Sequence, residues 1–190
     1  MKPETENLTA NQSLDLITKM INQAQGNVRG SSFHFLLWGW VVAVANLGMF
    51  MLIQMEYSRP YVVWLITIPA WLTSMYVGFK RGREERIVTH IDRINMWMWI
   101  IYGISIFTLV FFGNSINWNL NPVILLMTFV PTFISGVVLR FKPLMLGGIS
   151  MWFFSIVCFL VDMQYQFLVG ALAVIVGYLV PGYLLRSKKD

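Results

Sequence analysis

Long stretches without a charged side chain constrain this sequence more than any other feature. Charge-free runs cover residues 30–55, 60–79, 94–139, 143–161 and 163–185. The third run is interrupted by a polar segment with four asparagines and a proline, residues 114–122. Each resulting segment is long enough, at about 1.5 Å per residue, to cross a hydrocarbon core of roughly 30 Å. We therefore predict an all-α, polytopic membrane protein with six transmembrane helices, at about 33–55, 60–79, 94–113, 122–139, 143–161 and 165–185.

The distribution of Lys and Arg predicts the orientation. The chain is 57% hydrophobic and 12% charged, about half the charged share of a soluble domain. If successive spans cross in alternate directions, 13 of the 14 Lys and Arg residues lie on one side, and Arg59 lies on the other. Cytoplasmic loops carry such an excess of positive charge. We expect a multi-pass protein of the cell inner membrane with both termini cytoplasmic. The net charge of +5 then reflects topology and does not indicate a nucleic-acid partner.

The spans are expected to pair into three antiparallel hairpins. Their outward connections are residues 56–60, 114–122 and 162–166, and each even-numbered span ends in an inward basic cluster. Near the middle of spans two, four and six lie Pro69, Pro131 and Gly177. This correspondence hints at a hairpin repeated three times. Any hairpin that obeys the positive-inside rule would look similar, so the repeat stays one of two readings.

Residues 1–30 are predicted to form a cytoplasmic unit ahead of the transmembrane bundle of residues 31–190. Leu14, Ile17 and Ile21 recur at helical spacing, and Ala24 and Val28 continue the pattern. The pattern predicts an amphipathic helix, which the glycines at 26 and 30 are expected to loosen before the first span. Its apolar stripe could lie among lipid headgroups, pack on the bundle or bind a partner.

A second candidate contact surface lies between spans two and three, in residues 80–93. Its basic residues are close in sequence: Lys80, Arg81, Arg83 and Arg86. Each basic residue near an anionic membrane surface contributes about 1 kcal/mol of attraction. We expect this cluster to contact anionic lipid or a cytosolic protein.

No residue pattern indicates catalysis or a bound cofactor. Ionisable residues at mid-membrane depth would mark a functional site, and the spans contain none. His34 and His90 lie in different segments and Cys158 is the single cysteine, so no metal or haem is expected. Nucleophile-elbow, metalloprotease and phosphate-loop motifs do not occur. We expect a protein that is not an enzyme and uses no cofactor.

Five residues at membrane depth are candidates for a pocket or an intramembrane polar contact: Asn46, Pro69, Trp71, Pro131 and Trp152. Asn46 is the most polar of them and is expected to hydrogen-bond within the bundle. The prolines free backbone carbonyls that could line a cavity, although a plain kink explains them too. An interfacial aromatic belt explains most of the other Trp and Tyr residues. The two tryptophans named here are predicted to lie deeper.

Two segments, SLDLITKMINQA at residues 13–24 and SFHFLLWGW at residues 32–40, resemble a family of small, uncharacterised bacterial multi-span membrane proteins. The resemblance covers roughly residues 1–50 and, more loosely, the spans. It implies residence in a bacterial inner membrane. It also suggests that the N-terminal helix and the entry of the first span act together, but it carries over no activity.

Two functional hypotheses follow. The first is a non-enzymatic sensor, scaffold or regulatory subunit, which would offer a cytoplasmic helical face to a cytosolic protein or to the lipid bilayer. The alternative is a small transporter or channel for a neutral or apolar solute, assembled as a homo-oligomer. The first rests on how much of the non-membrane sequence lies on one side. The second rests on the helix-kinking prolines and the deep tryptophans.

Overall fold

The computed structural model describes residues 10–84 and 90–187, which form helices and turns without a strand in either range. The α-helices are α1 (Ala10–Gln54), α2 (Thr67–Glu84), α3 (His90–Phe111), α4 (Leu120–Val138), α5 (Lys142–Leu160), α6 (Met163–Val174) and α7 (Val180–Ser187). A short 3-10 helix, Pro60–Ile66, precedes α2, and another, Gly113–Ile116, follows α3. A π-helical turn, Ile175–Leu179, joins α6 to α7.

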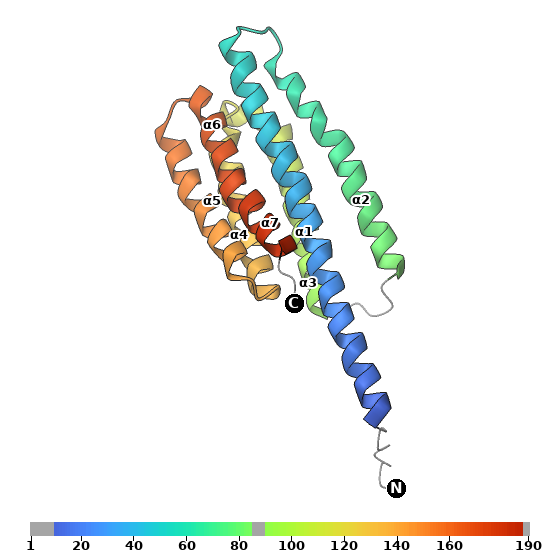
Figure 1. Ribbon diagram of the computed structural model, residues 1–190. Coiled ribbons are helices and arrows are strands. Elements are labelled where there is room, and N and C mark those ends of the chain that lie inside the picture. Colours follow the sequence, from blue (N-terminus) through green and yellow to red (C-terminus); the bar gives the residue numbers. More distant parts are fainter. Residues whose placement is uncertain (1–9, 85–89, 188–190) are drawn as a thin grey trace.

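Within the two described ranges, six helical segments are long and apolar enough to cross a membrane: Ser32–Gln54, Pro60–Lys80, Arg93–Phe111, Leu120–Val138, Lys142–Leu160 and Met163–Ser187. Each bound lies within two residues of the bound predicted from the sequence. The prediction of an all-helical protein with six membrane-crossing segments is therefore confirmed. Successive segments are joined at alternate ends of the bundle (Figure 1).

The first helix is longer than the sequence pattern indicated. α1 has 45 residues and passes without a break through the glycines at 26 and 30, where the chain was expected to loosen. An interior glycine costs a helix only about 1 kcal/mol, and no proline occurs between residues 10 and 54. The boundary near residue 30 is therefore not an interruption of the helix. Figure 1 shows the first part of α1 extending well beyond the bundle.

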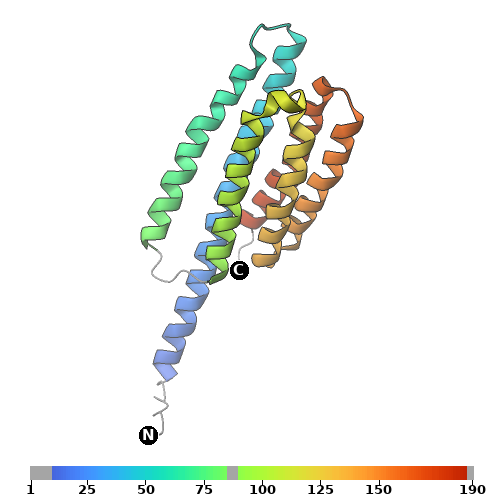
Figure 2. The same ribbon diagram turned by 180° about the vertical axis from the view of Figure 1, so that it is seen from behind.

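The spans are not equivalent in their packing. α1, α4, α5 and the α6–α7 unit form the centre, with a core that includes Phe35, Leu144, Met151, Tyr178 and Leu185. Among the described residues, α2 packs mainly against α1 and the 3-10 helix before it, and α3 packs mainly against α4 (Figure 2). Both outer helices expose apolar side chains on most of their surface. Lipid tails are as apolar as these side chains, so such exposure is stable in a membrane.

Glycines set the closest helix contacts in the centre. A Cβ atom added to Gly147 in α5 would lie 2.5 Å from the carbonyl oxygen of Gly177 in the π-helical turn. A Cβ atom on Gly136 in α4 would lie 2.6 Å from the backbone nitrogen of Met145 in α5. Backbones approach this closely only where small residues leave room, and the resulting packing drives helix association in lipid.

Candidate functional site

One face of α3 carries three polar side chains toward α4. The spacing of Asn95, Trp99 and Tyr102 places them on the same side of the helix. The Trp99 indole N–H donates to the Ser135 hydroxyl at 3.1 Å, and that hydroxyl donates to Asn95 Oδ1 at 3.1 Å. Tyr102 Oη lies 2.7 Å from Thr128 Oγ1. Since the Thr128 hydroxyl donates to a carbonyl one turn earlier in α4, Tyr102 is the donor in this pair.

A second polar contact joins α4 to the π-helical turn. The Thr132 hydroxyl donates to Tyr178 Oη at 3.3 Å, and both side chains are buried. The same hydroxyl also lies 2.7 Å from the carbonyl of Thr128, so its single proton is shared between these two acceptors. Pro181 has no N–H for the carbonyl of Gly177 four residues earlier, which favours a wider turn here. Such π-helical turns often occur at functional sites.

Aromatic rings connect these contacts to α1. The ring of Phe35 lies 5.5 Å from that of Tyr178 and 6.0 Å from that of Trp99, and Trp99 lies 5.5 Å from Tyr102. Aromatic pairs of this kind contribute about 0.5–1.5 kcal/mol each beyond their buried area. We call the whole group the polar–aromatic cluster: Phe35, Asn95, Trp99, Tyr102, Thr128, Thr132, Ser135 and Tyr178. It joins α1, α3, α4 and the π-helical turn.

The last span fixes α1 next to this cluster. A Cβ atom on Gly39 would lie 2.6 Å from Leu179 Cδ2, so α1 and the π-helical turn are in close contact there. The indole N–H of Trp40 donates to the hydroxyl of Tyr183 at 3.0 Å. Any tilt of α1 would therefore disturb the last span.

Asn46 lies deeper, between α1 and α6. Its side chain is 2% exposed, and its Nδ2 atom donates to the carbonyl of Val42 at 2.9 Å. It thus hydrogen-bonds within its own helix, while its Oδ1 atom has no partner among the described residues. A Cβ atom on Gly170 would lie 3.0 Å from Oδ1, so the amide occupies the space that this glycine leaves.

The other candidates for a pocket do not join Asn46. Trp71 on α2 and Trp152 on α5 are 55% and 45% exposed, so both face outward. Pro69 is exposed on α2, and Pro131 is buried within α4. In the described ranges these residues do not line a shared interior cavity.

The candidates for partner or lipid contact fall at one end of the molecule. The apolar set lies in the part of α1 that precedes the first span: Leu14, Ile17 and Ile21. The basic set at the end of α2 is Lys80, Arg81 and Arg83, of which Lys80 and Arg83 are exposed. Arg86 lies outside the described residues.

The chemistry that these groups can perform is hydrogen bonding and packing. The polar–aromatic cluster contains hydroxyl, indole and amide groups, and every member is uncharged in its ordinary protonation state. In the two described ranges, no three His, Cys, Asp or Glu residues are grouped so that they could hold a metal ion. The cluster can therefore orient helices or accept a neutral polar group.

None of the eight members of the cluster was among the site candidates named from the sequence. Trp99 and Tyr102 were attributed to the interfacial belt, although their spacing from Asn95 marks a common helix face. Tyr178 could have been noticed because Pro181 follows Gly177 by four residues, which removes a helical hydrogen bond beside it.

Comparisons with known protein families, with curated proteins and with solved structures found no match to this chain.

Proposed function

We propose that this protein is a non-enzymatic sensor, scaffold or regulatory subunit of a bacterial inner membrane, which presents a cytoplasmic helix to a protein partner. The observation that carries the proposal is the continuity of α1. Its 45 residues include the 23-residue span Ser32–Gln54, which leaves 45 − 23 = 22 residues outside the span. At 1.5 Å per residue they extend the helix by about 33 Å.

The charge distribution supports a cytoplasmic location for this extension. Lys80, Lys142 and Arg186 are exposed at the end of α2, the start of α5 and the end of α7. These helix ends lie at the side of the bundle from which the first part of α1 emerges (Figure 1). Excess positive charge favours the cytoplasmic side. In this orientation the spans form three antiparallel hairpins with both termini inside.

The extension offers an apolar stripe for recognition. The three- and four-residue steps between Leu14, Ile17 and Ile21 put them on one face of a helix, whereas Gln12 and Gln23 fall on the opposite face. An amphipathic helix that lays such a stripe into a groove is a common mode of protein recognition.

The contacts of α1 give this surface a route into the membrane. Phe35 packs against Trp99 and Tyr178, so a shift of α1 changes contacts with α3 and with the π-helical turn together. A partner that binds the extension would thereby sense, or alter, the packing of the spans. This coupling distinguishes a sensor or regulatory subunit from a passive anchor.

The transport hypothesis has less support from the geometry. It rested on the prolines and on the deep tryptophans, and the outward orientation of Trp71 and Trp152 removes them from a solute path through the described part of one protomer. We therefore favour the regulatory role.

The test compares two double variants with the same change in charge. Ile17→Asp with Ile21→Asp places two carboxylates on the apolar stripe, and Gln12→Asp with Gln23→Asp places them on the opposite face. A photo-crosslinking residue at position 18, at the edge of the stripe, reports the neighbours of the helix in intact cells. We expect one cytosolic protein to be crosslinked in the wild type and the glutamine variant, and to be lost in the isoleucine variant at equal membrane abundance.

Two results would contradict the proposal. Crosslinks to lipid alone would mean that the stripe lies in the headgroup layer. Failure of a chain starting at residue 30 to accumulate in the membrane would mean that the extension is needed for folding rather than for recognition.

A further inference from the structure

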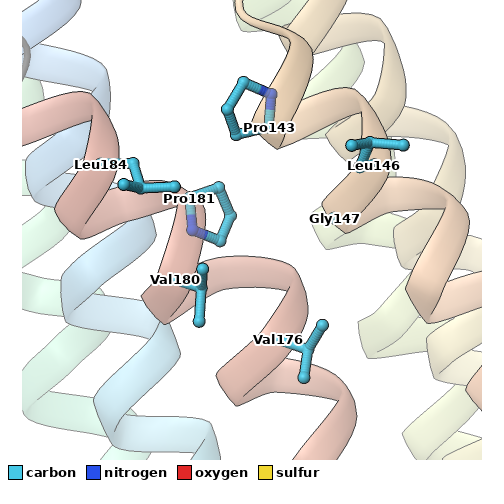
Figure 3. Close-up of a pocket in the computed structure, with 7 residues that line it drawn as sticks. All are labelled: Pro143, Leu146, Gly147, Val176, Val180, Pro181 and Leu184. Carbon is cyan, nitrogen blue, oxygen red and sulfur yellow. The ribbon is translucent and has the colours of Figure 1, made fainter.

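An apolar wedge opens between α5 and the last span, at the end of the bundle where α5 begins and α7 ends (Figure 3). Its volume is about 340 Å³, within the range of roughly 300–1,000 Å³ that is typical of ligand pockets. The lining residues on α5 are Pro143, Leu146 and Gly147. Those on the facing span are Val176, Val180, Pro181 and Leu184. All of these side chains are apolar.

The wedge is closed at depth and open at the surface. It ends where Gly147 meets Gly177, because the two backbones are in contact there. Toward the start of α5 the two helices diverge, as Figure 3 shows. Leu146, Val180 and Leu184 line the opening and are exposed. An elongated apolar group could therefore enter from the surrounding lipid.

Two exposed cations adjoin the lining residues in the sequence at this end of the bundle. Lys142 directly precedes Pro143, and Arg186 follows Leu184 by two residues; both are exposed. The start of α5 and the end of α7 lie at the same end of the bundle (Figure 1). Within the described ranges neither side chain forms an ion pair. Between residues 93 and 187 the single acidic residue is Asp162, at the opposite end of α5.

We propose that this wedge binds one acyl chain of an anionic phospholipid, whose phosphate is held by Lys142 and Arg186. The apolar lining suits a hydrocarbon chain, and the two cations at the same end of the bundle suit an anionic headgroup. Basic pockets between membrane helices are known to select anionic lipids on this principle. The site is separate from the N-terminal surface of the proposed function and does not depend on it.

A protein helix is a poor occupant of the same space. A helix is roughly 10 Å across, and a segment as long as the wall from Val176 to Leu184, about 12 Å, would fill on the order of 900 Å³. The wedge offers about 340 Å³. A lipid tail matches both its volume and its access from the bilayer.

The experiment is native mass spectrometry of the intact protein, after delipidation, with equal amounts of dioleoyl-phosphatidylglycerol and dioleoyl-phosphatidylcholine. The two probes share their acyl chains and differ in headgroup charge. We expect one retained lipid, with the anionic probe favoured at least tenfold. Lys142→Gln with Arg186→Gln should abolish this preference, because each basic residue contributes roughly fivefold. The matched control, Arg59→Gln with Arg93→Gln, alters two exposed cations that do not adjoin the wedge and should leave the preference unchanged.

A second pair of variants tests the acyl-chain site itself. Val180→Trp fills the wedge, whereas Val130→Trp adds the same bulk to an equally exposed position on α4, which does not line it. We expect the first to lower retention of both lipids at least fivefold and the second to have no effect, with similar thermal unfolding for each. Equal retention of the two probes, an equal loss in the Arg59 and Arg93 control, or no effect of Val180→Trp would overturn the proposal. So would a lipid-free dimer that Val180→Trp dissociates, because the wedge would then be a self-association surface.

Discussion

Replacement of Gly147 by alanine should destabilise the bundle more than any other single methyl addition to the α5 face. The new Cβ atom would lie 2.5 Å from the carbonyl oxygen of Gly177, whereas ordinary contacts of this kind begin at 3.4 Å. The two backbones must therefore separate by about 0.9 Å (3.4 − 2.5). A carbonyl cannot rotate away as a side chain can, so the cost should approach the upper part of the roughly 1–3 kcal/mol range for overpacking.

Two glycines elsewhere supply the controls for this prediction. A Cβ atom on Gly103 in α3 or on Gly78 in α2 has no neighbour within 4 Å. Alanine at either position should be neutral or should stabilise its helix by up to about 1 kcal/mol. The assay is thermal unfolding in detergent, followed by circular dichroism. A Gly147→Ala melting temperature equal to that of Gly103→Ala would refute the contact between α5 and the last span.

Three further predictions concern the cluster and the topology. A double-mutant cycle of Thr132→Val and Tyr178→Phe should give a coupling energy of about 0.6–2 kcal/mol in unfolding measurements, since their hydroxyl groups lie 3.3 Å apart. Strict additivity would argue against that hydrogen bond. Reporter fusions after residues 87 and 190 should be cytoplasmic and one inserted at Asn117 external; a cytoplasmic signal at Asn117 would exclude six crossings. Glutamine at Lys80, Arg81, Arg83 and Arg86 together should produce a mixture of orientations in a protease-accessibility assay, because these residues enforce the inside position of the α2–α3 connection. A single orientation would assign the cluster to partner binding instead.

The number and bounds of the membrane-crossing segments could be predicted because charge is excluded from hydrocarbon. One charged residue at each end of a run is enough to locate it, as Arg140 and Lys142 do between α4 and α5. The orientation of each helix about its axis could not be predicted in the same way. The lipid and the interior of the bundle are both apolar, so the spacing of apolar residues does not show whether Trp71 or Trp152 faces lipid or a neighbouring helix.

The polar–aromatic cluster depends on contacts between distant segments. The hydrogen bonds that join its helices link residues 26 to 46 positions apart, and no local pattern pairs Thr128, Thr132 and Ser135 with their partners on α3 and the last span. The π-helical turn at Ile175–Leu179 likewise reflects the close packing of Gly177 on α5 together with the effect of Pro181. The proline can be read from the sequence, but the helix that packs against this turn cannot.

Because α1 is continuous, a tilt about a fixed point within the first span displaces its N-terminal end by a larger distance. Gly39, where the helix rests against Leu179, is 39 − 10 = 29 residues from Ala10, a distance of about 44 Å along the axis. A tilt of about 5° at that point would move the free arm by about 4 Å, close to the pitch of one helical turn. At Phe35, only one turn from the pivot, the same tilt displaces the ring by roughly 0.5 Å. Small changes in packing among the spans would thus produce movements at the far end of α1 that are large enough to open or close a binding surface.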